Sequence, residues 1–151
     1  MYQRILVPVD GSDVSDIGLR EAMRLAHDQQ ARLRLIHVVN ELAVIAAYEG
    51  TIYSNELIQT LRDNGAKILQ KAADKVKAAG LQVETSLIEA HGGHAGDAIV
   101  REAQQWPADI IVLGTHGRRG TARLVLGSDA EQVVRQANVP VLLVKPPLQK
   151  K

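Results

Sequence analysis

The apolar residues of the chain follow two spacings, one typical of buried strands and one typical of amphipathic helices. The run from Ile110 to Leu113 is wholly apolar, which indicates a strand covered on both faces of a sheet. Ala22, Leu25 and Ala26 recur at helical spacing, which indicates one buried helix face. Patterns of these two kinds predict strands over 3–9, 32–39, 82–88, 108–113 and 140–145, and helices over 13–29, 55–79, 95–105 and 129–136.

Residues at the boundaries refine this assignment. Ser12 or Asp13 can cap the helix over 13–29, and Gly80 is a natural end for the helix over 55–79. Gly65 lies inside that second helix and costs about 1 kcal/mol relative to alanine, which allows a kink or break there. The strand over 82–88 alternates, which is typical of a sheet edge. The apolar stretch 43–47 fits either a short helix or a partly buried lid.

Strands that alternate with helices are typical of a parallel α/β sheet with right-handed crossovers. Five strands and four helices fit a doubly wound sheet, and a length of 151 residues predicts a single domain over 1–151. In such a sheet, ligands bind outside the carboxyl ends of the strands, where the strand order reverses. The residues that follow each strand are therefore the first candidates for a binding site.

A glycine-rich loop follows the strand over 108–113. It holds Gly114, Gly117 and Gly127, and Ser128 then opens the next helix. Because glycine lacks a Cβ, backbone N–H groups can face a concavity there, and a helix start favours an anion. The pattern predicts a phosphate cradle, and the alternative is that these glycines only shape turns.

Three motifs carry a resemblance to a known family. The pattern G-x2-G-x9-G-[ST] at 114–128 resembles the nucleotide-binding signature of the universal stress protein family. The opening ILVPVDGS at 5–12 and the close VPVLLV at 139–144 also look like that family, so the likeness covers essentially the whole chain. It implies a Rossmann-like sheet in order 3-2-1-4-5, with the first and fourth strands side by side. Asp10 and Gly114 would then face one crevice.

The resemblance also implies a role for individual residues. Asp10 would accept hydrogen bonds from ribose, although it could instead cap the following helix. The backbone of Val38 would meet the adenine edge, while Gly127 and Ser128 would bind the terminal phosphates. The full expected nucleotide site is Pro8, Val9, Asp10, Val38, Leu113, Gly114, His116, Gly117, Arg118, Arg119, Gly127, Ser128 and Asp129.

Some of these residues have competing uses. Ser128 and Glu131 match a capping box, in which the serine hydroxyl caps its own helix. Asp129 would repel phosphates unless a magnesium or manganese ion intervenes, so ATP is expected with Mg²⁺ or Mn²⁺ on its phosphates. Arg118 and Arg119 either clamp phosphates or are solvated loop residues.

Composition narrows the functional classes. A net charge of +1 and few aromatic residues argue against a nucleic-acid surface, and the lack of cysteine excludes disulfides and thiolate metal sites. His91 and His94 could form a metal pair, but no third ligand stands nearby in sequence, so a mobile loop is favoured. No segment has signal-peptide or membrane length, so we expect a cytoplasmic protein without direct membrane insertion.

The sequence leaves three functions open. The first is an ATP-binding stress-response protein that acts as a nucleotide-dependent switch for a regulatory partner. The alternative is a slow ATP hydrolase or nucleotidyl hydrolase at the same site, although no catalytic set and no Walker lysine are present. A purely structural interaction protein fits least, because it would not need the glycine motif. The resemblance implies a homodimer through the last strand, Val141, Leu142, Leu143 and Val144.

Overall fold

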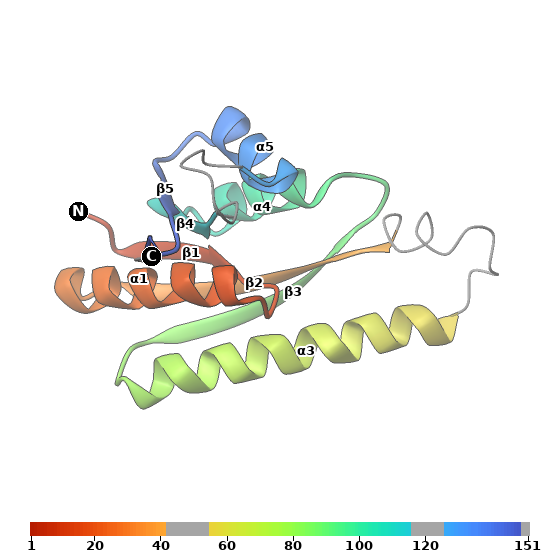
Figure 1. The fold of residues 1–151 in the computed structure, drawn as a ribbon, viewed down its shortest axis with the longest axis horizontal. Coiled ribbons are helices and arrows are strands. Elements are labelled where there is room, and N and C mark those ends of the chain that lie inside the picture. The colour runs from red at the N-terminus through yellow and green to blue at the C-terminus, as the bar shows by residue number, and fades with distance from the viewer. Residues whose placement is uncertain (42–54, 116–125, 149–151) are drawn as a thin grey trace.

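A parallel sheet of five strands forms the centre of the computed structural model, which describes residues 1–41, 55–115 and 126–148 (Figure 1). The strands are β1 (Arg4–Pro8), β2 (Arg32–Asn40), β3 (Val83–Ala90), β4 (Ile110–Gly114) and β5 (Val141–Val144). They lie in the order β3-β2-β1-β4-β5, and every neighbouring pair is parallel. The predicted α/β class and the strand order implied by the family resemblance are both confirmed.

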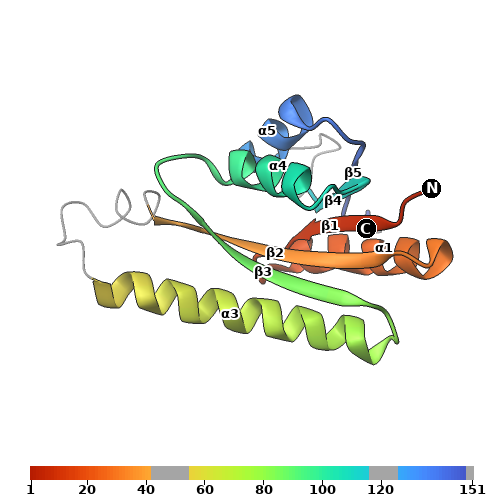
Figure 2. The ribbon, with the colours of Figure 1, turned by 180° about the vertical axis from the view of Figure 1, so that it is seen from behind.

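Helices cover both faces of the sheet (Figures 1 and 2). The helices α1 (Asp13–Gln29) and α3 (Asn55–Ala78) lie on one face, and α4 (Ala95–Gln105) and α5 (Ser128–Gln136) lie on the other. Successive residues of β1 pack into the hydrophobic cores on opposite faces of the sheet, because side chains alternate along a strand. Ile5 and Val7 pack with α1 and α3, whereas Leu6 packs with α4 and α5. The sheet is therefore doubly wound, as its pattern predicts.

The observed boundaries lie close to the predicted ones. α1 and α4 begin and end at the predicted residues, and the other described elements differ at their ends. The start of β4 differs because the Ala108 N–H donates to the Ala103 carbonyl at 2.8 Å. That bond keeps Ala108 in the turn after α4, so the strand begins only at Ile110.

The helix predicted over 55–79 does not break at Gly65, because α3 continues as one helix through that residue (Figure 1). A Cβ added to Gly65 would lie 2.7 Å from both His37 Cδ2 and Leu87 Cδ1. The glycine therefore lets α3 approach β2 and β3 closely. Helix propensity alone cannot predict such a contact between elements.

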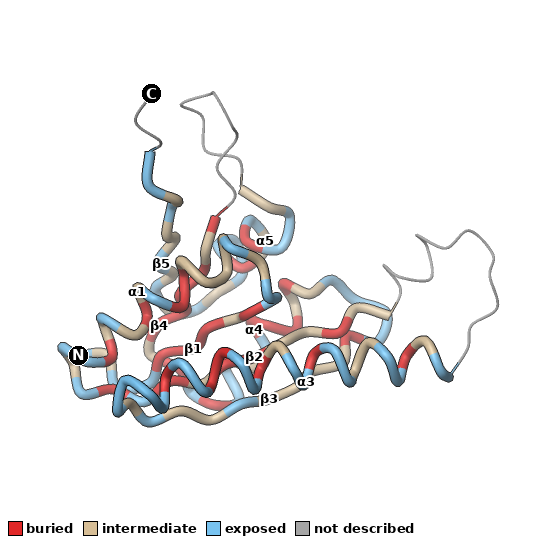
Figure 3. The backbone as a smooth tube through the Cα atoms, turned by 60° about the horizontal axis from the view of Figure 1, so that its bottom comes forward, coloured by how far each residue is buried: buried red, intermediate tan, exposed pale blue. Residues whose placement is uncertain are grey.

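The centre and the margins of the sheet differ in burial. The middle of β1 and the first four residues of β4 are buried between the helix layers, as the red central segments of Figure 3 show. β3 and β5 form the two margins, which confirms the predicted edge position of the 82–88 segment. Among the described helices, none is long and apolar enough to cross a bilayer. The predicted apolar stretch 43–47 lies outside the described residues.

Candidate nucleotide site

A pocket of about 290 Å³ opens where the strand order reverses. β1 pairs with both β2 and β4, so the carboxyl ends of these three strands lie together. The start of α5 closes one side of the pocket. Nine residues of the expected nucleotide site line it: Pro8, Val9, Asp10, Val38, Leu113, Gly114, Gly127, Ser128 and Asp129. The other four, His116, Gly117, Arg118 and Arg119, lie outside the described residues.

Asp10 stands at the end of β1 and begins the turn into α1. One of its carboxylate oxygens accepts a hydrogen bond from the Ser12 N–H at 2.8 Å, and its own N–H donates to Ser15 Oγ at 3.1 Å. Ser12 is the N-cap of α1, because its hydroxyl accepts from the Ser15 N–H at 3.1 Å. Since Ser12 caps the helix, the alternative role of Asp10 as its cap is wrong. The exposed Asp10 carboxylate keeps a second oxygen that can accept hydrogen bonds from a ligand.

Gly114 at the end of β4 permits a tight contact with α1. A Cβ built on Gly114 would lie 2.0 Å from the Val14 carbonyl oxygen, and one built on Gly18 would lie 2.7 Å from the Gly114 nitrogen. Two facing glycines therefore bring the backbone of α1 against the tip of β4. The next residue, Thr115, is completely buried, and its N–H and hydroxyl both donate to the Val144 carbonyl. The loop that carries the glycine motif thus starts from a fixed point.

His37 lies beside Val38 on β2 and also lines the pocket. Its Nδ1 lies 2.8 Å from the Val9 carbonyl oxygen. Because a carbonyl can only accept, the histidine must donate through Nδ1, which ties the end of β2 to the end of β1. Gly65 of α3 leaves the space that the ring occupies. The sequence prediction used His37 only to locate Val38, since a histidine in a strand carries no spacing signal.

The start of α5 leaves backbone donors free for a ligand. Gly127 is the N-cap, Ser128 is the first helical residue, and no side chain caps this end of the helix. The predicted capping box of Ser128 with Glu131 is therefore wrong. It fails because the helix begins one residue earlier than predicted, which places Ser128 inside the first turn. The N–H groups of that first turn have no intrahelical acceptor, so they can bind an anion.

The charges of the described lining residues are unbalanced. Asp10 and Asp129 are both acidic, and no lysine or arginine is among the described residues around the pocket. Two carboxylates repel a polyphosphate unless cations accompany it. A divalent ion suits this set, because carboxylate, hydroxyl and phosphate oxygens are the hard ligands that Mg²⁺ and Mn²⁺ prefer.

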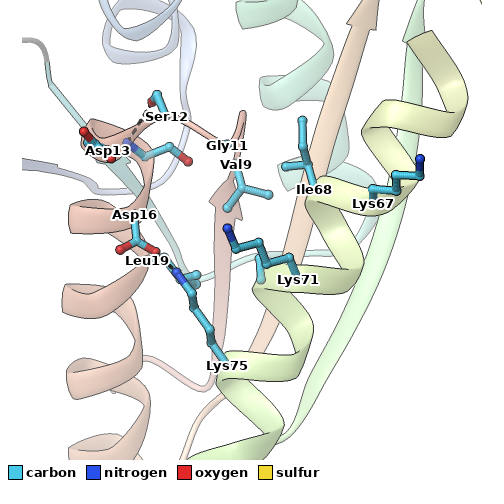
Figure 4. A pocket seen from close by; sticks show the side chains of 12 residues that line it. Val9, Gly11, Ser12, Asp13, Asp16, Leu19, Lys67, Ile68, Lys71 and Lys75 are labelled. Atoms are coloured by element: carbon cyan, nitrogen blue, oxygen red, sulfur yellow. Dashed lines mark hydrogen bonds and ion pairs between the residues drawn. The ribbon is translucent and has the colours of Figure 1, made fainter. Parts of the chain in front are cut away.

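A second pocket, of about 320 Å³, lies on the other side of the β1 tip, between α1 and α3 (Figure 4). Lys75 crosses this groove to Asp16 at 2.5 Å, and its hydrogen bond lowers the pKa of that carboxyl. Lys71 extends from α3 toward the end of β1. Neither β4 nor α5 contributes to this groove. Of these two pockets among the described residues, the one at the tips of β1 and β4 combines the two predicted strand tips with the start of α5.

Comparisons with known proteins match this architecture. Residues 1–145 match the universal stress protein family. The universal stress protein MJ0531 of Methanocaldococcus jannaschii is 36% identical over 149 residues, which is 97% of this chain and 84% of the relative. The solved structure of MJ0577 from the same organism is 28% identical, covers 99% of each chain and has a TM-score of 0.81.

Two further solved structures carry bound nucleotides. A universal stress protein from Archaeoglobus fulgidus in complex with dAMP is 26% identical, with a TM-score of 0.67 over 95% of this chain and 98% of that one. A universal stress protein in complex with cAMP is 28% identical, with a TM-score of 0.65 over 97% and 98%. The family match and the identity over nearly the full length agree with the fold, so this chain belongs to the universal stress protein family.

Proposed function

We propose that this protein binds ATP in the pocket at the tips of β1 and β4, and that nucleotide occupancy switches its interaction with a protein partner. One observation carries the proposal. Residues from four separate segments, expected on sequence grounds to bind one nucleotide, line a single pocket. The adenine nucleotides named for two similar structures support the same ligand class.

Each part of the nucleotide has a suitable neighbour in this pocket. The free oxygen of Asp10 accepts hydrogen bonds from the ribose hydroxyls. Val38 lies at the end of β2, where its backbone meets the adenine edge. The N–H groups at the start of α5 and the Ser128 hydroxyl receive the phosphates.

The metal requirement follows from the charges of the site. Mg²⁺ or Mn²⁺ on the phosphates offsets the negative charge of Asp10 and Asp129, and Ser128 adds a neutral oxygen. Arg118 and Arg119 directly follow Gly117 in the sequence and supply further positive charge. ATP binding is therefore expected to weaken when the divalent ion is removed.

Calorimetric titration of the purified chain tests the proposal. ATP with Mg²⁺ is expected to bind more tightly than AMP, because only ATP reaches the start of α5 with its outer phosphates. Asp10→Ala should weaken ATP binding by about tenfold or more, since a hydrogen bond to a charged group contributes about 1.5–3 kcal/mol. Asp13→Ala is the matched control, because Asp13 is a nearby exposed acid that does not line this pocket.

The outcomes separate the parts of the proposal. No binding at millimolar ATP would end it, and equal losses in the Asp10 and Asp13 variants would place the ligand elsewhere. Equal affinity for ATP and AMP would remove the phosphate role of α5. Phosphate release measured on the same samples tests the alternative of a slow hydrolase, for which Asp10 and Asp129 are the described carboxylates beside the phosphates. Turnover that Asp10→Ala abolishes would favour that alternative.

A nucleotide-dependent switch also needs a surface that changes with nucleotide binding and that a partner can contact. We propose that the chain forms a homodimer through β5, whose outer edge is unpaired within the sheet. Gly114 lines the nucleotide pocket, and the next residue, Thr115, donates through its N–H and its hydroxyl to the Val144 carbonyl of β5. Nucleotide binding beside Gly114 can therefore bias the dimer surface.

A further inference from the structure

A group of three potential metal ligands lies at the carboxyl ends of β2 and β3, outside the nucleotide pocket. Glu41 directly follows β2, and His91 directly follows β3. The last pair of the β2–β3 register is Asn40 with Ala90, so Glu41 and His91 each follow one member of that pair. Glu89 lies two residues before His91, near the end of β3. The fold thus brings Glu41, which is far from His91 in the sequence, to Glu89 and His91.

The three side chains lie near enough to one another to share an ion after a local adjustment. One oxygen or nitrogen from each of them lies within 4.8 Å of the others. His91 Nε2 lies 3.5 Å from Glu89 Oε2, whereas the other ring nitrogen, Nδ1, lies 4.0 Å from Glu41 Oε2, so the ring must turn for one nitrogen to meet an ion held by both carboxylates. Ligand atoms around tetrahedral zinc lie about 3.4 Å apart for bonds of about 2.1 Å. Gly92 and Gly93 follow His91, so a small shift of this loop can bring the imidazole inward.

The surroundings favour an ion at this position. The Glu41 side chain is only 12% exposed, and His91 Nδ1 lies 4.0 Å from its Oε2, beyond hydrogen-bond distance. A carboxylate with so little contact with water gains from a cation. Arg62 of α3 donates through Nε to Glu89 Oε1 and through its Nη2 to Oε2 at 3.1 Å. Arg62 thereby fixes the orientation of Glu89, and an ion at this position would share the Glu89 carboxylate with that guanidinium.

The choice of metal follows from the ligand types. One imidazole and two carboxylates suit Zn²⁺ and related transition-metal ions better than Mg²⁺, which prefers oxygen ligands alone. We propose that Glu41, Glu89 and His91 form a binding site for a zinc-class divalent cation at the ends of β2 and β3.

This site is separate from the proposed nucleotide site, because none of its three ligands lines the pocket at the tips of β1 and β4. The ion would join the ends of two strands that are otherwise held by the β2–β3 ladder. It would also tie Glu41, the first residue after β2, to the start of the loop before α4. Failure of ATP binding would therefore leave the zinc proposal standing, and the reverse is also true.

The test uses the full chain stripped of metal with a chelator and titrated with Zn²⁺ in a calorimeter. Binding of one ion per chain is expected. His91→Ala and Glu41→Gln should each weaken it by at least about tenfold, the range measured for groups around metal sites. His94→Ala is the matched control, because His94 is the N-cap of α4 and does not belong to the group of three. Its affinity for Zn²⁺ should stay within about twofold of the parent chain.

Cobalt absorption gives a second readout, since Co²⁺ bound by His91 should show visible bands that His91→Ala abolishes. His91 is 72% exposed, so its replacement is expected to leave the fold intact. Absence of Zn²⁺ binding would overturn the proposal. The proposal would also fail if His94→Ala lost as much Zn²⁺ affinity as His91→Ala, or if Glu41→Gln kept the full Zn²⁺ affinity of the parent chain. ATP titration of the His91→Ala chain should match the parent, which keeps the two sites distinguishable.

Discussion

Gly65 sets two residue-level effects against each other. Alanine is a better helix former than glycine by about 1 kcal/mol, so propensity alone predicts that Gly65→Ala stabilises α3. The added Cβ would lie 2.7 Å from the His37 ring, however, and overpacking of a core costs about 1–3 kcal/mol. We expect packing to win, with a loss on the order of 1 kcal/mol in the free energy of unfolding, measured with urea.

Asn64→Ala is the control for this substitution. Asn64 is the exposed neighbour on the same helix, so the change supplies improved helix propensity without a new contact. It should stabilise the chain by a few tenths of a kcal/mol. If Gly65→Ala proved as stabilising as Asn64→Ala, the contact between α3 and His37 would not constrain the fold.

Residues differ in how well sequence alone predicts their roles. Asp10 and Gly114 could be placed at one pocket, because strand tips and glycine spacing are visible in the sequence and the family resemblance implies that their two strands are neighbours. The contact of Gly18 with Gly114 could not, since it depends on how closely α1 crosses β4. The capping assignment for Ser128 failed for a related reason. A shift of one residue in the start of α5 changes which group is the N-cap, and boundaries are the weakest part of a sequence reading.

At the scale of elements, a polar cluster ties β2, β3 and α4 together. Arg34 of β2 donates to Glu84 of β3 at 2.9 Å and to Glu102 of α4 at 2.5 Å. Trp106, the C-cap of α4, donates through Nε1 to Glu84 at 2.8 Å, and Arg34 lies 5.0 Å from its ring centre. The hydrogen bond from Arg34 is the largest cause of a lowered pKa for Glu84.

This lowered pKa gives a prediction for acid stability. A carboxyl whose pKa is lower in the folded chain than in the unfolded chain binds more protons when the chain is unfolded. Its contribution to the free energy of unfolding is therefore fully present above the ordinary pKa of 4.5 and is lost as the pH falls below that value. Glu84→Gln should therefore flatten the decline of unfolding free energy between neutral pH and a pH below 4.5. Glu56→Gln, at an exposed glutamate with no ion pair among the described residues, should leave that decline unchanged. Parallel declines in the parent and Glu84→Gln chains would contradict the assignment.

The elements themselves follow from local patterns, because α1 and α4 carry strong helical periodicity and buried strands carry continuous apolar runs. The cluster around Arg34 was not predicted. Its members are far apart in the sequence and come together only once β2 and β3 are in register and α4 packs on their face. The same limit hid the group of Glu41, Glu89 and His91. Cross-strand partners need the register, which a single sequence does not specify.

At the scale of the whole molecule, the strand order was predictable through the family resemblance, whereas alternation of strands and helices indicated only a doubly wound sheet. The sheet edges follow from that order. β3 is long and alternates, while β5 is short and apolar, so the two edges differ in what they can bind. An unpaired apolar edge tends to recruit a further strand, and β5 is therefore the surface on which the proposed dimer depends.

Leu142 provides the test of that dimer, because it is 36% exposed on the edge strand although its neighbours Val141 and Leu143 pack against the core. A charge on an edge strand opposes pairing with a second chain. Leu142→Lys should therefore convert the dimer into monomers in sedimentation velocity at micromolar concentration. Val134→Lys is the control, since Val134 is 45% exposed on α5, away from the edge. A monomeric parent chain, or equal dissociation in both variants, would contradict a dimer through β5.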